Sequence, residues 1–201
     1  MSSTTKLIER TREGDEAAFN DLFGKLYAEL RMVARSQRRR LAASETINTT
    51  AVVHEAYARL DGKDEPVVFN DRAHFFRLAA GMMRSVIIDY ARSQSRVKRG
   101  GRERPVSLAA IGPIVAEAGP ASSGINIHEA LALDQSLGTL AQFDPEAARV
   151  VELRYFAGLS VVETAEALAM SPATVKRRWT FARAWLHQRL SDTPNTKDGD
   201  T

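Results

Sequence analysis

Residues 159–190 read LSVVETAEALAMSPATVKRRWTFARAWLHQRL, which predicts two helices joined by a tight turn. Ser160 followed three residues later by Glu163 is a capping-box start for the first helix. Ser171 followed by Pro172 starts the second, with a hydroxyl N-cap and a proline at the first helical position, where its missing N–H costs nothing. The first helix has one apolar face, made by Val162, Ala165 and Leu168, which we expect to be buried.

The second of these helices is cationic near its start, where Lys176, Arg177 and Arg178 follow one another. A helix, a short turn and a cationic helix form the arrangement of a helix-turn-helix that reads the DNA major groove. An ordinary helical hairpin with a solvated basic face is the alternative. Because the caps, the spacing and the charge agree, the pattern favours DNA binding.

Composition indicates a globular protein. The 201 residues are enough for one large or two small domains, and 44% hydrophobic residues allow a buried core. The absence of cysteine excludes disulfides, thiolate metal sites and cysteine nucleophiles. The first ten residues lack the apolar segment of a signal peptide, and no run of 18 apolar residues occurs. We therefore expect a cytoplasmic protein with no membrane partner.

Charge is distributed in blocks, which the net charge of +3 conceals. Residues 92–104 contain six Lys or Arg and a single acidic residue, and residues 35–40 contain four Arg. No Lys or Arg occurs in residues 105–148. Local basic blocks of this kind favour a polyanionic partner.

Helical periodicity runs through most of the chain, without the alternation of a strand. Before the two-helix motif, the expected helix boundaries are a start at Gly14-Asp15, a cap at Thr49 or Thr50 with an end at Asp61-Gly62, a cap at Asp71, a start near Ile127, and a helix from Asp144-Pro145 to Gly158. Residues 105–126 are rich in Gly, Pro, Ala and Ser, as linkers are. We expect helical domains at 1–100 and 128–190, a linker at 101–127 and a disordered tail at 191–201.

The helix that follows Asp71 carries an arginine stripe. Arg77, Arg84, Arg92 and Arg96 lie within about a third of its circumference, so they can follow a line of phosphates. A merely solvated face is the alternative, and the continuation into the basic block at 92–104 favours the nucleic-acid interpretation. Unpaired bases stack on exposed aromatic rings, for which Phe69 and Phe76 are the better candidates; the spacing of Phe75 and Tyr90 suits the core.

No enzyme chemistry is indicated. The four histidines are scattered, and the sequence contains no zincin, nucleophile-elbow or Walker motif. His54 and Glu55 are adjacent and would point about 100° apart on a helix, away from a common metal. We expect no catalytic residue, no metal and no cofactor.

Four stretches resemble the bacterial sigma-70 family, and most closely its extracytoplasmic-function (ECF) type, which keeps only the second and fourth sigma regions. They are TAVVHEAYARL (50–60), RAHFFRLAAGMMRSVIIDYAR (72–92), VVELRYFAGLSVVETAEALAMSPATVKRRW (150–179) and ARAWLHQRL (182–190). The run KRGG at 98–101 is similar to one seen in the same subgroup. The resemblance implies an all-α fold in which sigma region 2 and a helix-turn-helix region 4 are joined by the linker.

The resemblance also implies three contact surfaces. Docking on the clamp helices of the largest RNA polymerase subunit would use Val53, His54, Glu55, Tyr57 and Arg59. Binding of the −10 promoter element and capture of an extruded base would use Phe69, Asn70, Arg72, Phe76, Arg77, Arg84, Ser85, Arg92 and Arg96. Reading of the −35 element in the major groove would use Ser171, Ala173, Thr174, Lys176, Arg177 and Arg178, against an inner side of Val175, Trp179, Ala182 and Leu186. The implied partners are core polymerase (clamp helices and flap region), promoter DNA and an anti-sigma protein, and the linker would run through the polymerase toward the RNA exit path.

Two residues depart from the family's pattern. Ala169 stands in the turn where relatives usually have Gly, and a positive φ there would cost on the order of 1 kcal/mol. Ser85 stands where many ECF proteins have Asn, which puts the base contact of that position in doubt.

The leading hypothesis is therefore a promoter-specificity subunit without catalysis of its own. The runner-up is a stand-alone regulator that binds duplex DNA as a dimer without polymerase. The basic helix at 72–96 and the lack of an α/β receiver pattern argue against this runner-up. A nucleic-acid-modifying enzyme is a third reading, for which the sequence offers no cluster of acids, bases, metal ligands or nucleophiles.

Overall fold

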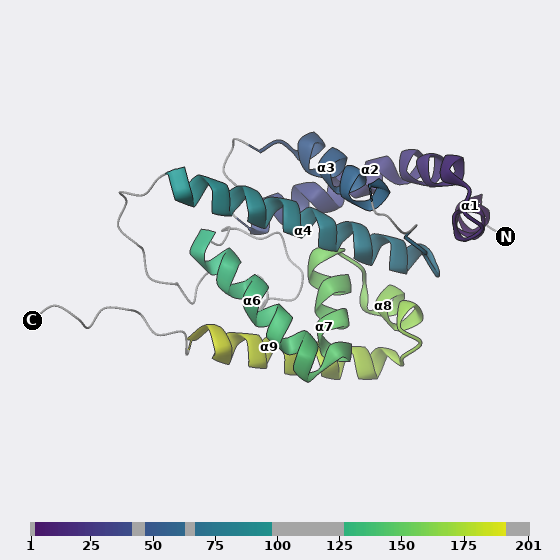
Figure 1. The fold of residues 1–201 in the computed structure, drawn as a ribbon. Coiled ribbons are helices and arrows are strands. Elements are labelled where there is room, and N and C mark those ends of the chain that lie inside the picture. Colours follow the sequence, from purple (N-terminus) through teal and green to yellow (C-terminus); the bar gives the residue numbers. More distant parts are fainter. Residues whose placement is uncertain (1–2, 42–46, 63–66, 98–126, 192–201) are drawn as a thin grey trace, which may run out of the picture.

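The computed structural model describes residues 3–41, 47–62, 67–97 and 127–191. All regular secondary structure in these residues is helical, which confirms the predicted all-α class (Figure 1). Within the same residues, no helix is both long and apolar enough to cross a membrane. The predicted linker and tail lie almost entirely outside the described residues.

Four helices build the N-terminal half: α1 (Ser3–Arg12), α2 (Glu16–Arg40), α3 (Thr49–Asp61) and α4 (Arg72–Val97). The predicted start of α2 is confirmed, since Gly14 has φ +86° and the Asp15 carboxylate accepts a hydrogen bond from Ala18 N–H at 3.1 Å. The short α1, which packs on α2, was not predicted. It buries Ile8 together with two threonines, and this mixed face gave no apolar period.

The cap of α3 is Asn48, so the prediction of Thr49 or Thr50 was wrong. The Asn48 side chain accepts from Ala51 N–H at 2.7 Å. Thr49 is buried, and its hydroxyl is occupied by Arg38, whose Nη1 donates to it at 3.0 Å. The predicted end at Gly62 is confirmed, because the Gly62 N–H bonds back to Ala58 O at 2.8 Å.

The C-terminal half contains α6 (Ile127–Phe143), α7 (Pro145–Val151), the π-helical turn η2 (Glu152–Phe156), α8 (Val161–Ala167) and α9 (Pro172–Ser191). The predicted cap is confirmed, since the Asp144 carboxylate accepts from Ala147 N–H at 3.0 Å. Gly158, at φ +79°, lies just beyond η2 and ends this run of helix, as predicted. The switch from α-helix to π-turn was not visible in the sequence.

Helix α4 lies at the centre of the molecule, between the two halves (Figure 1). It contacts α2 and α3 on one side and η2, α6 and α8 on the other. Buried residues therefore extend around most of its circumference: Phe75, Phe76, Ala79, Ala80, Met83, Val86, Ile87, Ile88 and Ala91. Such a wide buried face is expected of a helix that packs against neighbours on two sides. The two halves accordingly share one continuous hydrophobic cluster.

Candidate nucleic-acid interface

The predicted caps of the two-helix motif, α8 and α9, are both present. The Ser160 hydroxyl accepts from Glu163 N–H at 3.2 Å, and the Glu163 carboxylate accepts from Ser160 N–H at 2.8 Å. The backbone N–H of Ser160, and then its side-chain hydroxyl, lower the pKa of the Glu163 carboxyl. At the second helix, the Ser171 hydroxyl accepts from Thr174 N–H at 3.1 Å. Each cap satisfies a backbone donor that would otherwise lack a partner within its helix.

The turn between α8 and α9 contains a left-handed residue. Ala169 has φ +51°, the one positive φ of a non-glycine residue in the described part of the chain. Its N–H donates to Glu166 O at 3.3 Å, and the next residue, Met170, donates to Ala165 O at 2.9 Å. The positive φ considered for Ala169 from the sequence is therefore confirmed.

The buried face of α8 differs from the predicted one. Val162 is 58% exposed, so its assignment to the inner face was wrong. The inner positions are Thr164 and Ala165, with Val161 and Leu168 partly buried beside them. Thr164 is fully buried because its hydroxyl donates to Ser160 O at 2.8 Å, which satisfies the polar group within the helix. Ala165 and Leu168 thus face inward as predicted, and Val161 and Thr164 lie beside them in place of Val162.

Helix α9 divides its residues as predicted, with one exception. The expected inner side is buried: Val175, Trp179, Ala182 and Leu186. Ala173, Lys176 and Arg177 are exposed. Arg178 instead turns back to the start of α7, where its Nη1 lies 2.7 Å from the Asp144 carboxylate and its Nη2 lies 2.6 Å from the Glu146 carboxylate. Two of the three consecutive cations are thus presented to solvent, and the third holds two elements together.

Three arginines of α4 face the C-terminal half. Arg77 Nη1 lies 3.5 Å from the Glu152 carboxylate of η2. Arg84 Nε lies 3.2 Å from the Asp134 carboxylate of α6. Arg92 lies 3.6 Å from Asp89 on its own helix and 3.9 Å from Asp134. The side chain of Arg96 lies outside the described residues, and Ser85 is exposed.

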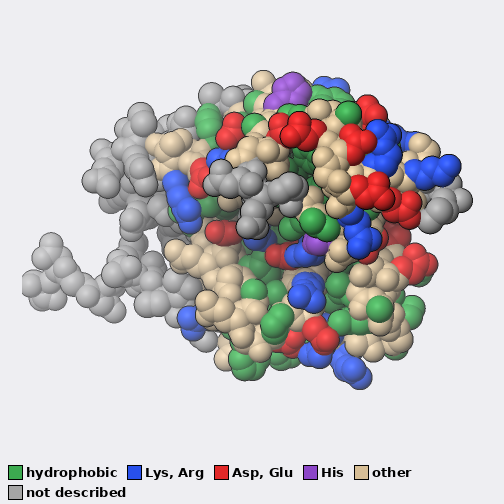
Figure 2. All heavy atoms as spheres, turned by 45° about the vertical axis from the view of Figure 1, so that its right-hand side comes forward, with side chains coloured by type: hydrophobic (Ala, Val, Ile, Leu, Met, Phe, Trp, Pro, Cys, Tyr) green, Lys and Arg blue, Asp and Glu red, His purple; other side chains and the backbone are tan. Residues whose placement is uncertain are grey.

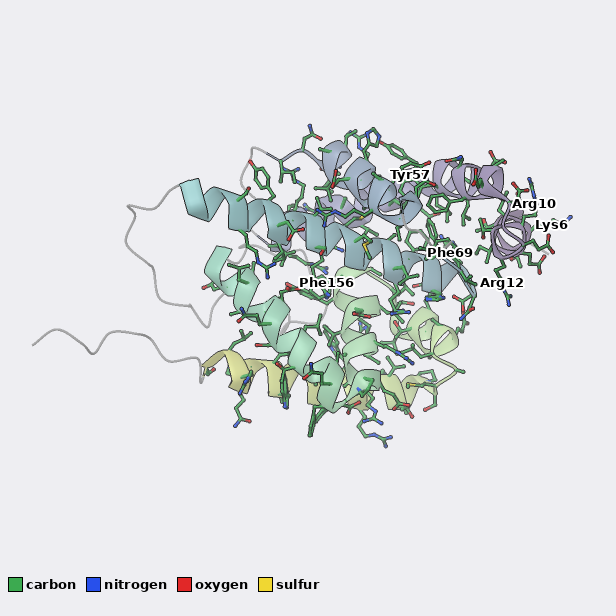
Figure 3. All side chains as sticks on the ribbon, in the orientation of Figure 1. Lys6, Arg10, Arg12, Tyr57, Phe69 and Phe156 are labelled. Carbon is green, nitrogen blue, oxygen red and sulfur yellow. The ribbon has the colours of Figure 1, made fainter. Side chains whose placement is uncertain are left out.

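The prediction that Phe69 and Phe76 are exposed was wrong. Phe69 is 1% exposed and lies parallel to the Phe19 ring at a centroid distance of 6.0 Å, inside the N-terminal half (Figure 3). Phe76 is 4% exposed and packs edge-on against Phe75. Phe69 precedes α4 and is covered by the rings of Phe19 and Phe75, and Phe76 is covered because α4 has neighbours on both sides. Spacing along one helix cannot reveal either contact. Neither ring is open to a nucleic-acid base in this conformation.

The residues that lead into α4 form a polar turn. The Asp71 carboxylate accepts from His74 N–H at 2.7 Å, which confirms the predicted cap. Asn70 is exposed, and its N–H donates to His74 Nδ1 at 3.1 Å. Burial, and then the positive charge of Arg77, lowers the pKa of His74. Arg72 is ion-paired with Glu29, and its guanidinium lies 4.9 Å from the centre of the Phe76 ring.

The candidate docking residues of α3 separate into a core side and a surface side. Val53 is fully buried, so this predicted contact residue belongs to the core. His54 and Glu55 are exposed. Arg59 lies 3.2 Å from Glu55 and 2.8 Å from Asp89. Tyr57 is half-buried, with its ring stacked on Phe19 at 5.5 Å.

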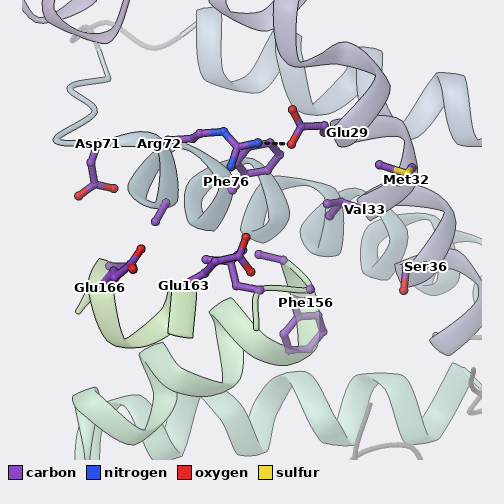
Figure 4. A pocket seen from close by; sticks show the side chains of 15 residues that line it. Glu29, Met32, Val33, Ser36, Asp71, Arg72, Phe76, Phe156, Glu163 and Glu166 are labelled. Atoms are coloured by element: carbon purple, nitrogen blue, oxygen red, sulfur yellow. Dashed lines mark hydrogen bonds and ion pairs between the residues drawn. The ribbon is translucent and has the colours of Figure 1, made fainter. Parts of the chain in front are cut away.

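A groove of about 580 Å³ lies between the two halves (Figure 4). Its apolar lining includes Met32 and Val33 of α2, Phe76 of α4, and Phe156 and Leu159 of the C-terminal half. Carboxylates also line it, from Glu29, Asp71, Glu163 and Glu166. The sequence did not predict this groove, because four separate elements contribute to it.

Charged side chains of both signs mark the boundary between the halves on the face that Figure 2 shows. The described residues of this face therefore form no continuous basic surface. The described residues also contain no group of three or more His, Asp or Glu side chains that could hold a metal ion.

Comparison with known proteins gives a family match and similarity to solved structures. A family model described as "ECF sigma factor" matches residues 1–192. No curated protein matches the chain significantly. Among solved structures, the chain is similar to CnrH, solved in complex with the cytosolic domain of CnrY. The two are 22% identical, with 96% of this chain and 100% of that chain covered and a TM-score of 0.40.

Proposed function

The chain belongs to the ECF sigma factor family, and on this premise we propose that three of its surfaces divide the work of promoter recognition. As a member it is a DNA-binding transcription factor that directs RNA polymerase to promoters and initiates transcription. The family is one of initiation factors, not of enzymes. The proposal assigns residues 1–100 to polymerase and −10 binding, and residues 128–190 to −35 binding.

We assign the binding of the −35 element to the start of α9. The proposed function depends chiefly on this assignment. Ser171 and Ala173 are exposed there together with the cations Lys176 and Arg177, on a helix whose inner side is fully packed. The N-terminal residues of such a helix reach base edges in the major groove, while its neighbour crosses the backbone. Thr174 is half-buried beside them. Arg178 supports the helix from behind through Asp144.

We assign the −10 element to the start and the arginine stripe of α4. Asn70 and Ser85 are exposed, and both can hydrogen-bond to nucleic acid. Arg77, Arg84 and Arg92 supply charge for a phosphate backbone. Since Phe69 and Phe76 are buried, we assign them to supporting this surface, not to stacking on a base.

We assign the binding of core polymerase to the exposed side of α3. His54 and Glu55 project from it, and Arg59 is held beside them by Glu55 and Asp89. Val53 and Tyr57 would act indirectly, by fixing α3 against the hydrophobic core of this protein. The flap region of the polymerase would contact the C-terminal half.

We further propose that the groove between α2, α4 and α8 is where an inhibitory anti-sigma segment would bind. Its apolar lining suits the apolar face of an amphipathic helix, and the exposed carboxylate of Glu166 at its edge suits a basic residue beside that face. Glu166→Lys, at the exposed edge of the groove, should then weaken inhibition in a transcription assay that contains the inhibitor.

Run-off transcription with core enzyme on a randomised promoter library tests the main proposal. We expect transcripts that depend on the protein and that share two separated sequence elements. Absence of promoter-dependent transcripts across the library would overturn the proposal. A gel-shift assay without core enzyme separates it from a stand-alone regulator, which should bind duplex DNA tightly as a dimer.

A further inference from the structure

A small polar pocket lies where the start of α4 meets the C-terminal half. Its volume is about 200 Å³, and its lining comes from the turn before α4, the first turns of α4, α7, η2 and α8. In Figure 1 the start of α4 lies against α8, whose end supplies Ala167 and Leu168 to the apolar wall of the pocket. Pockets for drug-sized ligands measure roughly 300–1,000 Å³, so the occupant of this one would be smaller.

The cations of this pocket come from both halves. Arg77 belongs to α4, and Arg149 belongs to α7. Arg149 is exposed, and no ion pair joins it to another described residue. The ion pair of Arg77 with Glu152 measures 3.5 Å, whereas a charge-assisted hydrogen bond of full strength is close to about 2.8 Å. Both guanidinium groups therefore keep N–H donors for a ligand.

His74 adds a third donor to the lining of the pocket. Its Nδ1 accepts a hydrogen bond from Asn70 N–H at 3.1 Å, so the neutral imidazole carries its proton on Nε2 and can donate it there. Burial lowers the pKa of His74 most, followed by the positive charge of Arg77; Asp71 raises this pKa, and Arg149 lowers it. The imidazole therefore lies in the positive field of guanidinium groups from both halves.

The described lining sets a single carboxylate against these cations. This carboxylate is Asp71, which already caps α4 by accepting a hydrogen bond from His74 N–H at 2.7 Å. The pocket also lies beside the N-terminus of α4, where the helix dipole is positive and favours an anion. Volume, donors and charge thus all favour a small anion with several acceptor oxygens.

From this arrangement we propose that the pocket binds a phosphate-type oxyanion, held by Arg77 of one half and Arg149 of the other, with His74 as a further donor. Each guanidinium group presents a planar fork that matches phosphate oxygens. A ligand held by both halves stabilises their closed arrangement, in which η2, α6 and α8 pack on α4, by mass action. The contact between the halves would therefore respond to the concentration of the anion. This goes beyond the promoter roles assigned above and does not depend on them.

The first test uses pyrophosphate and the full chain, without DNA or polymerase. Proton NMR of the imidazole C2–H signals gives the pKa of His74, and the variant His74→Gln identifies its signal among the four histidines. We expect pyrophosphate to raise this pKa toward its ordinary value, because a bound anion favours the imidazolium. Sodium chloride at equal ionic strength should raise it much less. An equal effect of sodium chloride would overturn the proposal, because screening alone would then explain it.

Isothermal titration calorimetry of variants tests the bridge between the halves. Arg149→Gln and Arg77→Gln should each weaken pyrophosphate binding about tenfold or more, the range for losing a hydrogen bond to a charged group. Arg149 is exposed, so its replacement leaves the fold intact. The control is Arg35→Gln, which removes an exposed arginine of α2 outside the pocket and should bind as the parent does.

Three calorimetric results would overturn the proposal. Equal weakening in Arg35→Gln would show that net charge alone attracts the anion. Binding of parent strength by Arg149→Gln would show that the C-terminal half takes no part in the site. Absence of binding to the parent at millimolar pyrophosphate would show that the pocket is not an oxyanion site.

Discussion

Ala169 holds a backbone conformation that costs an L-amino acid about 1 kcal/mol relative to glycine, because its φ is +51°. The same position sets the angle between α8 and α9. We expect Ala169→Gly to raise the free energy of unfolding by about 0.5 to 1 kcal/mol, measured by urea denaturation followed by circular dichroism. Ala184→Gly, at an exposed interior position of α9, is the control and should lower it by about 1 kcal/mol. The same sign for both variants would contradict the role of the turn.

His74 makes stability depend on pH. Its pKa is lowered in the folded protein, mainly by burial and then by Arg77 and Arg149, while Asp71 acts in the opposite direction. The folded state therefore binds the proton more weakly than the unfolded state does, and folding is favoured while His74 is neutral. This contribution is complete above the ordinary pKa of 6.5 and is lost as the pH falls from there through the folded value.

We expect the free energy of unfolding to decrease as the pH is lowered below 6.5, and we expect this decrease to be smaller in the variant His74→Gln. Urea denaturation at a series of pH values measures the free energy of unfolding of both proteins. His54→Gln, which changes an exposed histidine on α3, is the control and should leave the slope as in the parent. An unaltered slope in His74→Gln would show that another group is responsible.

At the scale of the element, different residues of α9 are expected to contact DNA and to hold the helix in place. Lys176 and Arg177 are exposed, whereas Arg178 joins α9 to Asp144 and Glu146 at the start of α7. Lys176→Ala/Arg177→Ala should reduce use of the −35 element and change unfolding by less than about 0.5 kcal/mol. Arg178→Ala should destabilise the protein by about 1 kcal/mol, since its pairs are partly exposed. Run-off transcription and urea denaturation of both variants check this, and a stability loss confined to the double variant would contradict it.

Helix α3 allows the polymerase surface to be tested apart from folding. Glu55 is exposed, and its partner Arg59 keeps a second carboxylate in Asp89, so Glu55→Lys should leave the fold intact. We expect this variant to lose co-purification with core polymerase. The control is Glu16→Lys, which makes the same change of charge at an exposed position on α2. This variant should co-purify with core polymerase normally. Normal co-purification of Glu55→Lys would remove α3 from the docking surface.

The elements also show which features could be predicted from sequence. The caps at Asp15, Ser160 and Ser171 depend on residues within one turn, so their local pattern was sufficient. The cap at Asn48 was missed because Thr49 is drawn inward by Arg38 from another helix. Burial of Phe69 and Phe76 was missed for a similar reason, since neighbours distant in sequence cover them. Of the candidate site, the exposed cations of α9 were predictable, whereas the carboxylates facing α4 depend on how the halves pack.

At the scale of the whole molecule, Gln37 links α2, α4 and η2. It is 1% exposed, and its Nε2 donates to Ala80 O and to Phe156 O, which belong to different halves. The halves also share one hydrophobic cluster, so they should unfold together. We expect Gln37→Met, which keeps the bulk and removes the donors, to lower the free energy of unfolding by about 1 to 2 kcal/mol.

The position of the tryptophans allows a test of whether the two halves unfold together. Both tryptophans, Trp179 and Trp185, lie on α9, so fluorescence reports the C-terminal half alone, while circular dichroism reports all helices. If the halves form one cooperative unit, Gln37→Met must move the fluorescence transition as far as the circular dichroism transition, although the substitution is on α2. Lys25→Met, exposed on the same helix, should move neither. A fluorescence transition that stays at its parent midpoint would mean that the C-terminal half is stable without the contact, and that the closed arrangement adds nothing to folding.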